Sequence, residues 1–115
     1  MIRRSTEMPE DIKVNMRGGE GQAVIKHVYK KDELKGNTRL TATITLEPGH
    51  SIGEHDHVDE EEIYYILQGE ATVIDDGKPV VVRPGDAVMT RDGASHSIKN
   101  TGTETLVFMA IINLY

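Results

Sequence analysis

The sequence predicts an all-β protein built as a single domain. Turn-forming residues recur along most of the chain about eight residues apart, a cadence typical of short strands joined by tight turns. These turns are Pro48-Gly49, Gly69, Asp75-Asp76-Gly77, Pro84-Gly85-Asp86, Arg91-Asp92-Gly93 and Asn100-Thr101-Gly102. The runs between them are rich in Val, Ile, Thr and Tyr, and none is long enough to indicate a helix. A length of 115 residues suits one hydrophobic core.

The turns divide the chain into an amino-terminal arm and a β-barrel domain. Residues 1–20 carry Pro9, Gly18 and Gly19 without a clear period, so we expect an arm whose order depends on what it packs against. Residues 21–115 form the barrel domain. We expect its strands at residues 22–30, 38–47, 52–57, 62–67, 70–75, 79–83, 87–90, 95–99 and 104–112.

Two of these strands have features that predict their neighbours. Along residues 40–46 the apolar Leu40, Ala42, Ile44 and Leu46 alternate with threonines, which predicts that the apolar side chains point inward. Further along, Asp76-Gly77 is a two-residue hairpin signal, because both residues tolerate positive φ. We therefore expect strands 70–75 and 79–83 to pair.

Two other segments are apolar on both faces, namely Ile63–Leu67 and Leu106–Ile112. A small barrel buries only one face of each strand, so their outer faces need a cover. The simplest cover is a second copy of the chain, and we predict a homodimer.

Composition excludes several classes of partner and site. The formal net charge of −6 argues against binding to a nucleic-acid backbone or to an anionic membrane surface. With no cysteine, any metal must be held by nitrogen and oxygen ligands. The amino-terminal sequence MIRRSTEMPED has no apolar segment behind its charges, and no stretch has the length of a membrane span, so we expect a cytoplasmic protein.

A set of histidines and one carboxylate has the spacing of a metal site. His55 and His57 stand two residues apart, so on a strand they project from the same face. A turn over residues 58–61 would bring Glu62 back opposite them, and His96, at the start of a later strand, could complete the set. Three imidazoles and a carboxylate suit one divalent transition-metal ion, namely Mn, Fe, Co, Ni, Cu or Zn, better than Ca or Mg.

The spacing of these residues resembles the two sequence motifs of the cupin family. Gly49, His55, His57, Glu62 and Gly69 match the first motif at each marked position. Gly85, Gly93, His96 and Asn100 match the second, and 15 residues separate the two motifs. The resemblance implies a double-stranded β-helix, which is a jelly-roll barrel, with His55, His57, Glu62 and His96 as metal ligands.

Within that family the chain is similar to the short single-domain members often compared with oxalate decarboxylases. Two positions depart from the pattern. Arg91 replaces a proline that usually precedes Gly93 in the second motif. Ile52 stands where oxalate decarboxylases carry an arginine that holds the substrate carboxylate, so the resemblance predicts a site without that anchor.

Other residues near the motifs are candidates for the cavity lining. Tyr64 shares strand parity with Glu62, so its hydroxyl could bind substrate or act as a weak acid. Ile98 has the parity of His96. We expect an apolar wall made of Ile98, Val73, Val82 and Phe108. We expect His27 and His50 to stay outside the site, and Asp59, Glu60 and Glu61 to form a solvated acidic turn.

Three functions remain open at this point. The leading hypothesis is a metalloenzyme, of decarboxylase or dioxygenase type, acting on a small carboxylic acid or related polar metabolite. The alternative is a non-catalytic module that binds or senses a small acid or sugar. A sugar isomerase is a third reading, since the resemblance alone does not select the chemistry.

Overall fold

The structure, a computed structural model, describes all residues from 1 to 115 and contains ten β-strands. The strands are β1 (Glu10–Val14), β2 (Gln22–Tyr29), β3 (Thr38–Leu46), β4 (Ser51–Asp56), β5 (Glu60–Gln68), β6 (Ala71–Asp75), β7 (Lys78–Val82), β8 (Ala87–Thr90), β9 (Ser95–Asn100) and β10 (Leu106–Leu114). The only helical segments are short 3-10 turns at Ser5–Glu7 (η1), Met16–Gly18 (η2) and Lys31–Glu33 (η3), and none of them could cross a bilayer. The expected all-β class is confirmed.

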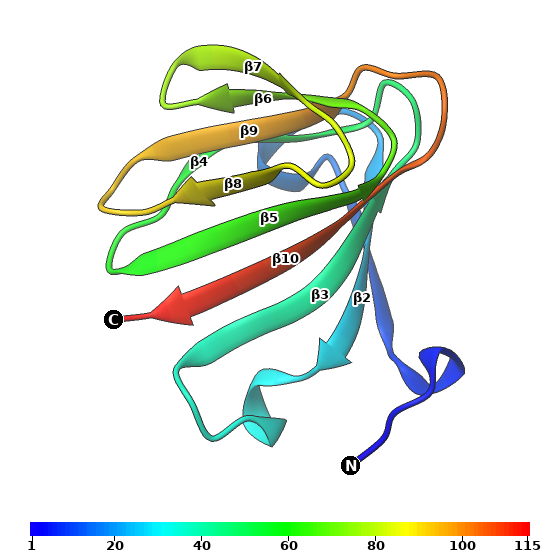
Figure 1. Cartoon of the computed structure of the whole chain (residues 1–115), viewed down its shortest axis with the longest axis vertical. Coiled ribbons are helices and arrows are strands. Elements are labelled where there is room, and N and C mark those ends of the chain that lie inside the picture. Colours follow the sequence, from blue (N-terminus) through cyan, green and yellow to red (C-terminus); the bar gives the residue numbers. More distant parts are fainter.

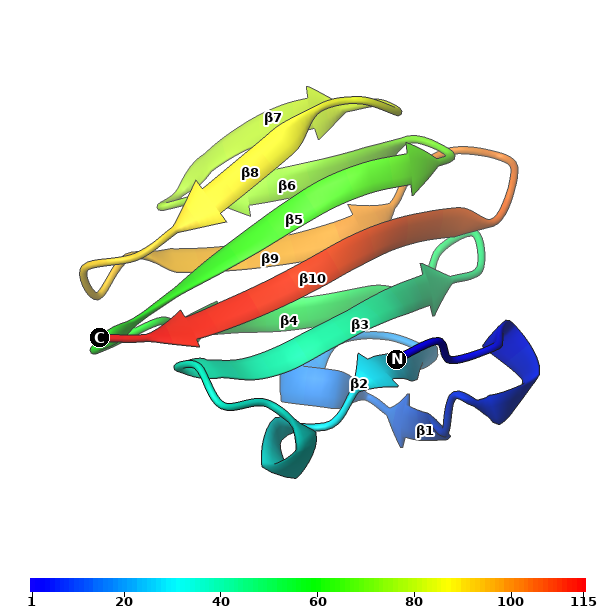
Figure 2. The same ribbon diagram turned by 60° about the horizontal axis from the view of Figure 1, so that its bottom comes forward.

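The strands form two antiparallel sheets that face each other (Figure 1). One sheet has the order β1-β2-β3-β10-β5-β8 and the other the order β4-β9-β6-β7. From β3 to β6 the chain passes from one sheet to the other at each turn, and it does so again from β7 to β10. Figure 2 shows the two layers with the core between them. This is the double-stranded β-helix that the motifs implied.

The local predictions for β3 and for the β6–β7 hairpin are also confirmed. Ala42, Ile44 and Leu46 are buried, and Leu40 packs against the same core. Strands β6 and β7 pair around Asp76-Gly77, both of which have positive φ. The apolar face of β3 therefore forms one wall of the interior that holds the site.

Residues 1–20, expected to form an arm, include a strand that joins the larger sheet. Strand β1 pairs with β2, and the backbone N–H of His27 donates to the carbonyl oxygen of Pro9 at 2.9 Å. Ahead of β1, the guanidinium of Arg3 donates to both carboxylate oxygens of Glu33, with Nη1 to Oε1 at 2.7 Å. These contacts fix the segment at the edge of the barrel.

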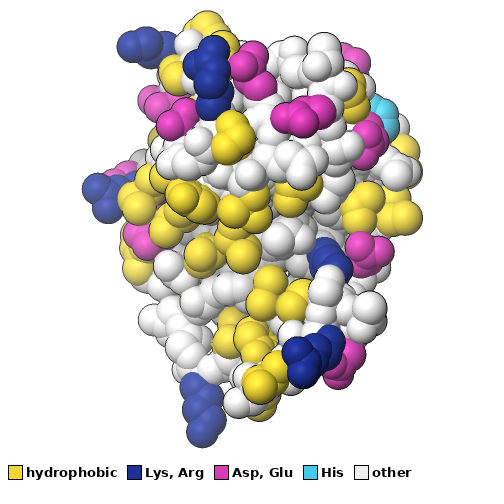
Figure 3. Space-filling view, turned by 45° about the vertical axis from the view of Figure 1, so that its right-hand side comes forward, with side chains coloured by type: hydrophobic (Ala, Val, Ile, Leu, Met, Phe, Trp, Pro, Cys, Tyr) yellow, Lys and Arg dark blue, Asp and Glu magenta, His cyan; other side chains and the backbone are white.

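The outer face of β5, β8 and β10 in the larger sheet is apolar, as the two-faced strands predicted. Tyr65 is 46% exposed, Leu67 47% and Met89 47%. Across the sheet Met109 pairs with Tyr65, and Ile111 pairs with Ile63. Figure 3 shows a side of the molecule on which hydrophobic side chains gather into connected areas. We call the outer-face residues Ile63, Tyr65, Leu67, Met89, Val107, Met109 and Ile111 the apolar face.

Candidate metal centre

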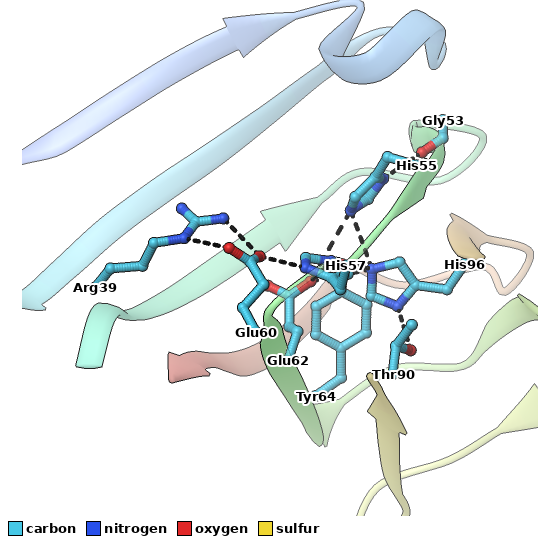
Figure 4. Close-up of polar contacts among 9 residues, drawn as sticks. All are labelled: Arg39, Gly53, His55, His57, Glu60, Glu62, Tyr64, Thr90 and His96. Atoms are coloured by element: carbon cyan, nitrogen blue, oxygen red, sulfur yellow. Dashed lines mark hydrogen bonds and ion pairs between the residues drawn. The ribbon is translucent and has the colours of Figure 1, made fainter. Parts of the chain in front are cut away.

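Three histidines and one glutamate converge inside the barrel, between the two sheets (Figure 4). His55 lies in β4, Glu62 in β5 and His96 in β9, while His57 directly follows β4. His55 and His96 are paired residues on neighbouring strands, and Glu62 approaches from the opposite sheet. One nitrogen or oxygen atom from each of the four lies within 4.8 Å of the others. The structure thus brings together the four residues that the motif spacing singled out.

A bulge in β4 sets the direction of these side chains. Ile52 pairs with Ile98, and His55 pairs with His96, so three steps along β4 match two steps along β9. In a regular strand Ile52 and His55 would point to opposite faces. Because of the bulge at Gly53 and Glu54, both side chains border the same internal cavity.

Each imidazole is oriented by a partner on its Nδ1 atom. His55 Nδ1–H donates to the carbonyl oxygen of Gly53 at 2.8 Å, and His57 Nδ1–H donates to Oε2 of Glu60 at 2.5 Å. His96 Nδ1 lies 2.8 Å from the hydroxyl of Thr90. Since a carbonyl and a carboxylate only accept, they fix the hydrogen on Nδ1 and leave a lone pair on Nε2. The Nε2 atoms point to the centre of the cluster.

The distances among the inward atoms fit ligands around one ion. His96 Nε2 lies 3.0 Å from Nε2 of His57 and 3.0 Å from Nε2 of His55. Glu62 Oε1 lies 3.0 Å from Nε2 of His57 and of His96, and 4.0 Å from Nε2 of His55. Two donors about 2.1 Å from an ion lie about 3 Å apart at a right angle and about 4 Å apart on opposite sides. The cluster is therefore compatible with a single metal ion.

Glu62 has a buried carboxylate oxygen that lacks a hydrogen-bond donor. Its side chain is 4% exposed, and Oε1 accepts no hydrogen bond. A buried carboxylate oxygen without a donor costs stability unless a cation or a proton satisfies it. Burial raises the pKa of Glu62, but the three imidazoles outweigh burial and hold the pKa well below its usual range. The group is thus ionised, the form that binds a metal.

The two buried histidines differ in their response to this environment. Burial lowers the pKa of His57, but the carboxylates of Glu62 and Glu60 outweigh it and the net pKa is raised. Burial also lowers the pKa of His96, and there Glu62 offsets it only in part, so the pKa stays below its ordinary value. The carboxylates thus favour positive charge at the cluster, which is the charge that a metal ion brings.

Glu60 is a site residue that the sequence analysis missed. We expected it in a solvated turn, yet its side chain is only 14% exposed and accepts the hydrogen bond from His57. Its two oxygens also accept from the guanidinium of Arg39, at 2.9 and 2.8 Å. Arg39, Glu60 and His57 form one continuous chain of charge-assisted hydrogen bonds. Glu60 shares the strand parity of Glu62 and stands three residues after His57, a signal that could have found it, whereas only the fold reveals Arg39.

Tyr64 lies beside the cluster. Its ring stacks on His96 with centroids 4.8 Å apart, and its hydroxyl oxygen lies 3.4 Å from Nε2 of His96. Burial and the negative charge of Glu62 raise the pKa of Tyr64 well above its usual range, so the phenol is protonated. The hydroxyl can therefore donate a hydrogen bond or a proton toward the centre of the site.

A cavity of about 160 Å³ opens next to the cluster. His55, His57, Glu62 and Tyr64 line its inner end, and Ile25, Leu40, Ile44, Ile52 and Ile112 form apolar walls. Val73, Val82, Ile98 and Phe108, which we expected in the lining, are buried in the core and do not border this cavity. Their inward parity is as expected, but they pack in the core cluster rather than along the cavity.

The two histidines expected outside the site behave differently from each other. His50 accepts a hydrogen bond from the backbone N–H of Gln22 at 3.2 Å and does not border the cavity. His27, by contrast, lines the cavity, and its Nε2 lies 2.8 Å from Oδ2 of Asp11. For His27 the expectation was wrong, because strand β2 turns this side chain toward the cavity rather than into solvent.

Comparison with known proteins agrees with this geometry. Residues 42–112 match the family described as the cupin domain, a span that contains all four residues of the cluster. In sequence, the chain is 45% identical over 114 residues to a protein of Thermotoga maritima named oxalate-binding protein, covering 99% of this chain and 94% of that one.

Solved structures give the same picture. A predicted oxalate decarboxylase from Thermotoga maritima superimposes with a TM-score of 0.95 at 44% identity, covering 100% of both chains. A putative sugar phosphate isomerase from Acidithiobacillus ferrooxidans has a TM-score of 0.77 at 28% identity, covering 99% of this chain and 75% of that one. The relatives thus share a fold while their names differ in chemistry.

Proposed function

Because this chain belongs to the cupin family, we propose that its His55, His57, Glu62 and His96 hold one divalent transition-metal ion, which binds a small carboxylic acid. The observation that carries the proposal is the buried Oε1 of Glu62, which accepts no hydrogen bond and faces three imidazole nitrogens. A metal ion would give that oxygen a partner and use all three Nε2 lone pairs.

The donor set limits the ion and its role. Three nitrogens and one carboxylate suit Mn, Fe, Co, Ni, Cu or Zn. When bound, such an ion supplies a Lewis acid that attracts carboxylate or enolate oxygens. The protein's own residues orient the ligand: the apolar walls around Ile44 and Ile52 exclude water, and the Tyr64 hydroxyl can donate a hydrogen bond to a ligand oxygen.

The cavity supports a ligand of few atoms. A volume of about 160 Å³ holds only about five water molecules, at about 30 Å³ each. The similar protein of Thermotoga maritima is named for binding oxalate, a dicarboxylate of two carbons, which is of this size class. Oxalate is therefore the first ligand to test.

Two measurements test the proposal. Elemental analysis of the purified protein should find about one transition-metal ion per chain, and His96→Ala or Glu62→Ala should abolish its uptake while the circular dichroism spectrum is retained. Calorimetric titration should then detect oxalate binding to the metal-loaded protein and none after chelation. Unchanged metal content in both variants would remove the basis of the proposal.

A catalytic role is the second candidate, and the Tyr64 hydroxyl near the cluster favours it. Decarboxylation of a small acid leaves an electron pair on the carbon that loses CO2, and that carbon must take up a proton from a nearby donor. Product formation from small carboxylic acids, lost in Tyr64→Phe with metal retained, would establish an enzyme. Binding without turnover would select the non-catalytic module, and turnover of sugar phosphates would select an isomerase.

The same proposal includes a homodimer and a cytoplasmic location. The apolar face offers seven large side chains to a partner, and a second copy presents an equally apolar surface. Association would remove this area from water, which is the main source of stability in obligate dimers. Cell fractionation tests the location.

A further inference from the structure

Residues of the amino-terminal arm reach the mouth of the cavity. Asp11, Lys13, Met16 and Arg17 all line it, although they precede the first residue that matches the cupin family. On β1, Asp11 and Lys13 are two residues apart and share a face, whereas Ile12 and Val14 point away and are exposed. The segment therefore presents its polar side chains to the cavity.

Two glycines hold this segment against β4. A Cβ atom on Gly53 would lie 2.0 Å from the carbonyl oxygen of Arg17, and one on Gly19 would lie 2.2 Å from the carbonyl oxygen of Ser51. Only glycine permits an approach this close. Gly53 also lies in the bulge of β4, so one residue serves both His55 and the placement of Arg17.

The backbone at this point adopts conformations that non-glycine residues avoid. Asn15 has φ of 51° and Arg17 has φ of 54°, both in the left-handed region. The turn is nonetheless fixed, since the Asn15 side chain donates to the carbonyl oxygen of Gly19 at 3.0 Å and its N–H donates to the carbonyl oxygen of Gly21 at 2.9 Å. Strain of this kind persists where the surroundings overdetermine it, often beside a binding site.

Two of the three cations at the mouth have no anionic partner. Arg39 is bound to Glu60, and the carboxylate of Asp11 is bound to His27. Arg17 and Lys13 have no carboxylate within ion-pair distance. The same cavity has apolar side chains in its walls, so an anion that enters it meets these two cations and the cluster.

We propose that Arg17, assisted by Lys13, binds the second anionic group of a small dicarboxylate whose first carboxylate lies at the His55, His57, Glu62 and His96 cluster. This inference rests on the proposed function and adds the ligand class. Position 52 carries an isoleucine and therefore offers no cation. On this proposal Arg17 of the arm supplies the cation instead. A guanidinium suits this role because its donors match a carboxylate in pairs. The arm, residues 1–20, is on this account part of the binding site.

The test compares dicarboxylates with monocarboxylates on the metal-loaded protein. Calorimetric titration measures Kd for oxalate, malonate and acetate in the wild type, Arg17→Met and the matched control Arg91→Met, whose parent arginine is exposed and outside the cavity. We expect Arg17→Met to raise the Kd for oxalate and for malonate by at least about tenfold, which is the effect of losing a hydrogen bond to a charged group. Acetate binding, metal content and all values for Arg91→Met should stay unchanged.

A second variant, Gly53→Ala, tests the placement of Arg17 rather than its charge. The added methyl group must displace residues 16–18, so dicarboxylate binding should fall as in Arg17→Met. Because the carbonyl oxygen of Gly53 also orients His55, metal content and acetate binding are measured in this variant too and should be retained. If the wild type binds no carboxylate, the proposed function fails. If it binds oxalate and both variants bind equally well, the role of Arg17 is overturned while the proposed function stands. If Arg17→Met weakened the binding of acetate and of oxalate by the same factor, the role of Arg17 would also be overturned, because the effect would not depend on a second anionic group.

Discussion

Oε2 of Glu60 lies 2.5 Å from Nδ1 of His57, which makes a residue outside the cluster the partner that orients one of its members. Glu60 is held in turn by Arg39. Removing the partner of a ligating histidine typically weakens metal affinity by about 10- to 100-fold. We therefore expect Glu60→Ala to lower metal affinity by about this factor, measured by competition with a chelator of known affinity.

The control for this prediction is Glu61→Ala, next along β5 but not bonded to a histidine. Its metal affinity should equal that of the wild type. Arg39→Met should have a smaller effect than Glu60→Ala, because Glu60 can still accept from His57. If Glu61→Ala lowered the metal affinity as much as Glu60→Ala, a general loss of negative charge near the site would explain both results.

Replacing Glu62 by methionine should remove the effect of metal on stability. The change deletes the only carboxylate among the four candidate ligands, so the variant should no longer hold the ion. Added metal at a concentration of 100 Kd should raise the free energy of unfolding of the wild type by about 2.7 kcal/mol, and its Tm with it, and should leave the variant unchanged. An equal stabilisation of both proteins by metal would contradict the assignment of Glu62 as a ligand.

Acid should release the arm from the barrel. The hydrogen bonds from Arg3, followed by one from the Lys30 backbone, lower the pKa of Glu33 from 4.5 to about 2. Because the folded-state pKa lies below the unfolded value, this contribution is present above pH 4.5 and is lost as the pH falls toward 2. Proteolysis of residues 1–8 by an acid-active protease should accelerate over that window, and the protection of their amides from exchange, relative to the unfolded chain at the same pH, should fall.

Glu33→Gln provides the control for the acid effect. In this variant the arm should open to the same extent at every pH in the window. If the arm in Glu33→Gln retained the same pH dependence as in the wild type, another group would be responsible. Protection that stays constant down to pH 2 in the wild type would show that the ion pair with Arg3 does not hold the arm.

The apolar face predicts a dimer that a single charge should disrupt. Light scattering should give about twice the chain mass of 12.8 kDa for the wild type. Met109→Lys places a charge opposite Tyr65 in the middle of this face and should yield the monomer, whereas Lys99→Met on the other sheet should not. A wild-type mass near 12.8 kDa would contradict the dimer.

Much of the fold could be predicted because its signals are local. Turns such as Asp76-Gly77 require residues that tolerate positive φ, and the alternation from Leu40 to Leu46 reflects one buried face, so both can be recognised along the chain. Strand β1 was not predicted, because its alternation covers only five residues and its apolar residues, Ile12 and Val14, face solvent rather than the core. It exists because β2 offers it an edge to pair with.

The candidate cluster was recognisable for a different reason. Its four residues lie in two short motifs whose spacing is fixed by strand parity and by the turn before Glu62. Glu60 stands three residues after His57, but its other partner, Arg39, lies on a strand 21 residues away, and His27 pairs with Asp11 of β1. Charged residues in a turn are usually solvated, and here the ion pair with Arg39 and the packing of the sheets hold Glu60 against His57.

By itself, the sequence determined the strand cadence, the inward faces of the strands and the four candidate ligands, because each depends on residues within a few positions of one another. The tertiary structure decided what surrounds the ligands. The bulge at Gly53 turned Ile52 to the cavity, and close backbone packing on the same glycine put Arg17 at its mouth. These arrangements join segments more than 30 residues apart, and such contacts are set by how the sheets close on each other rather than by any local pattern.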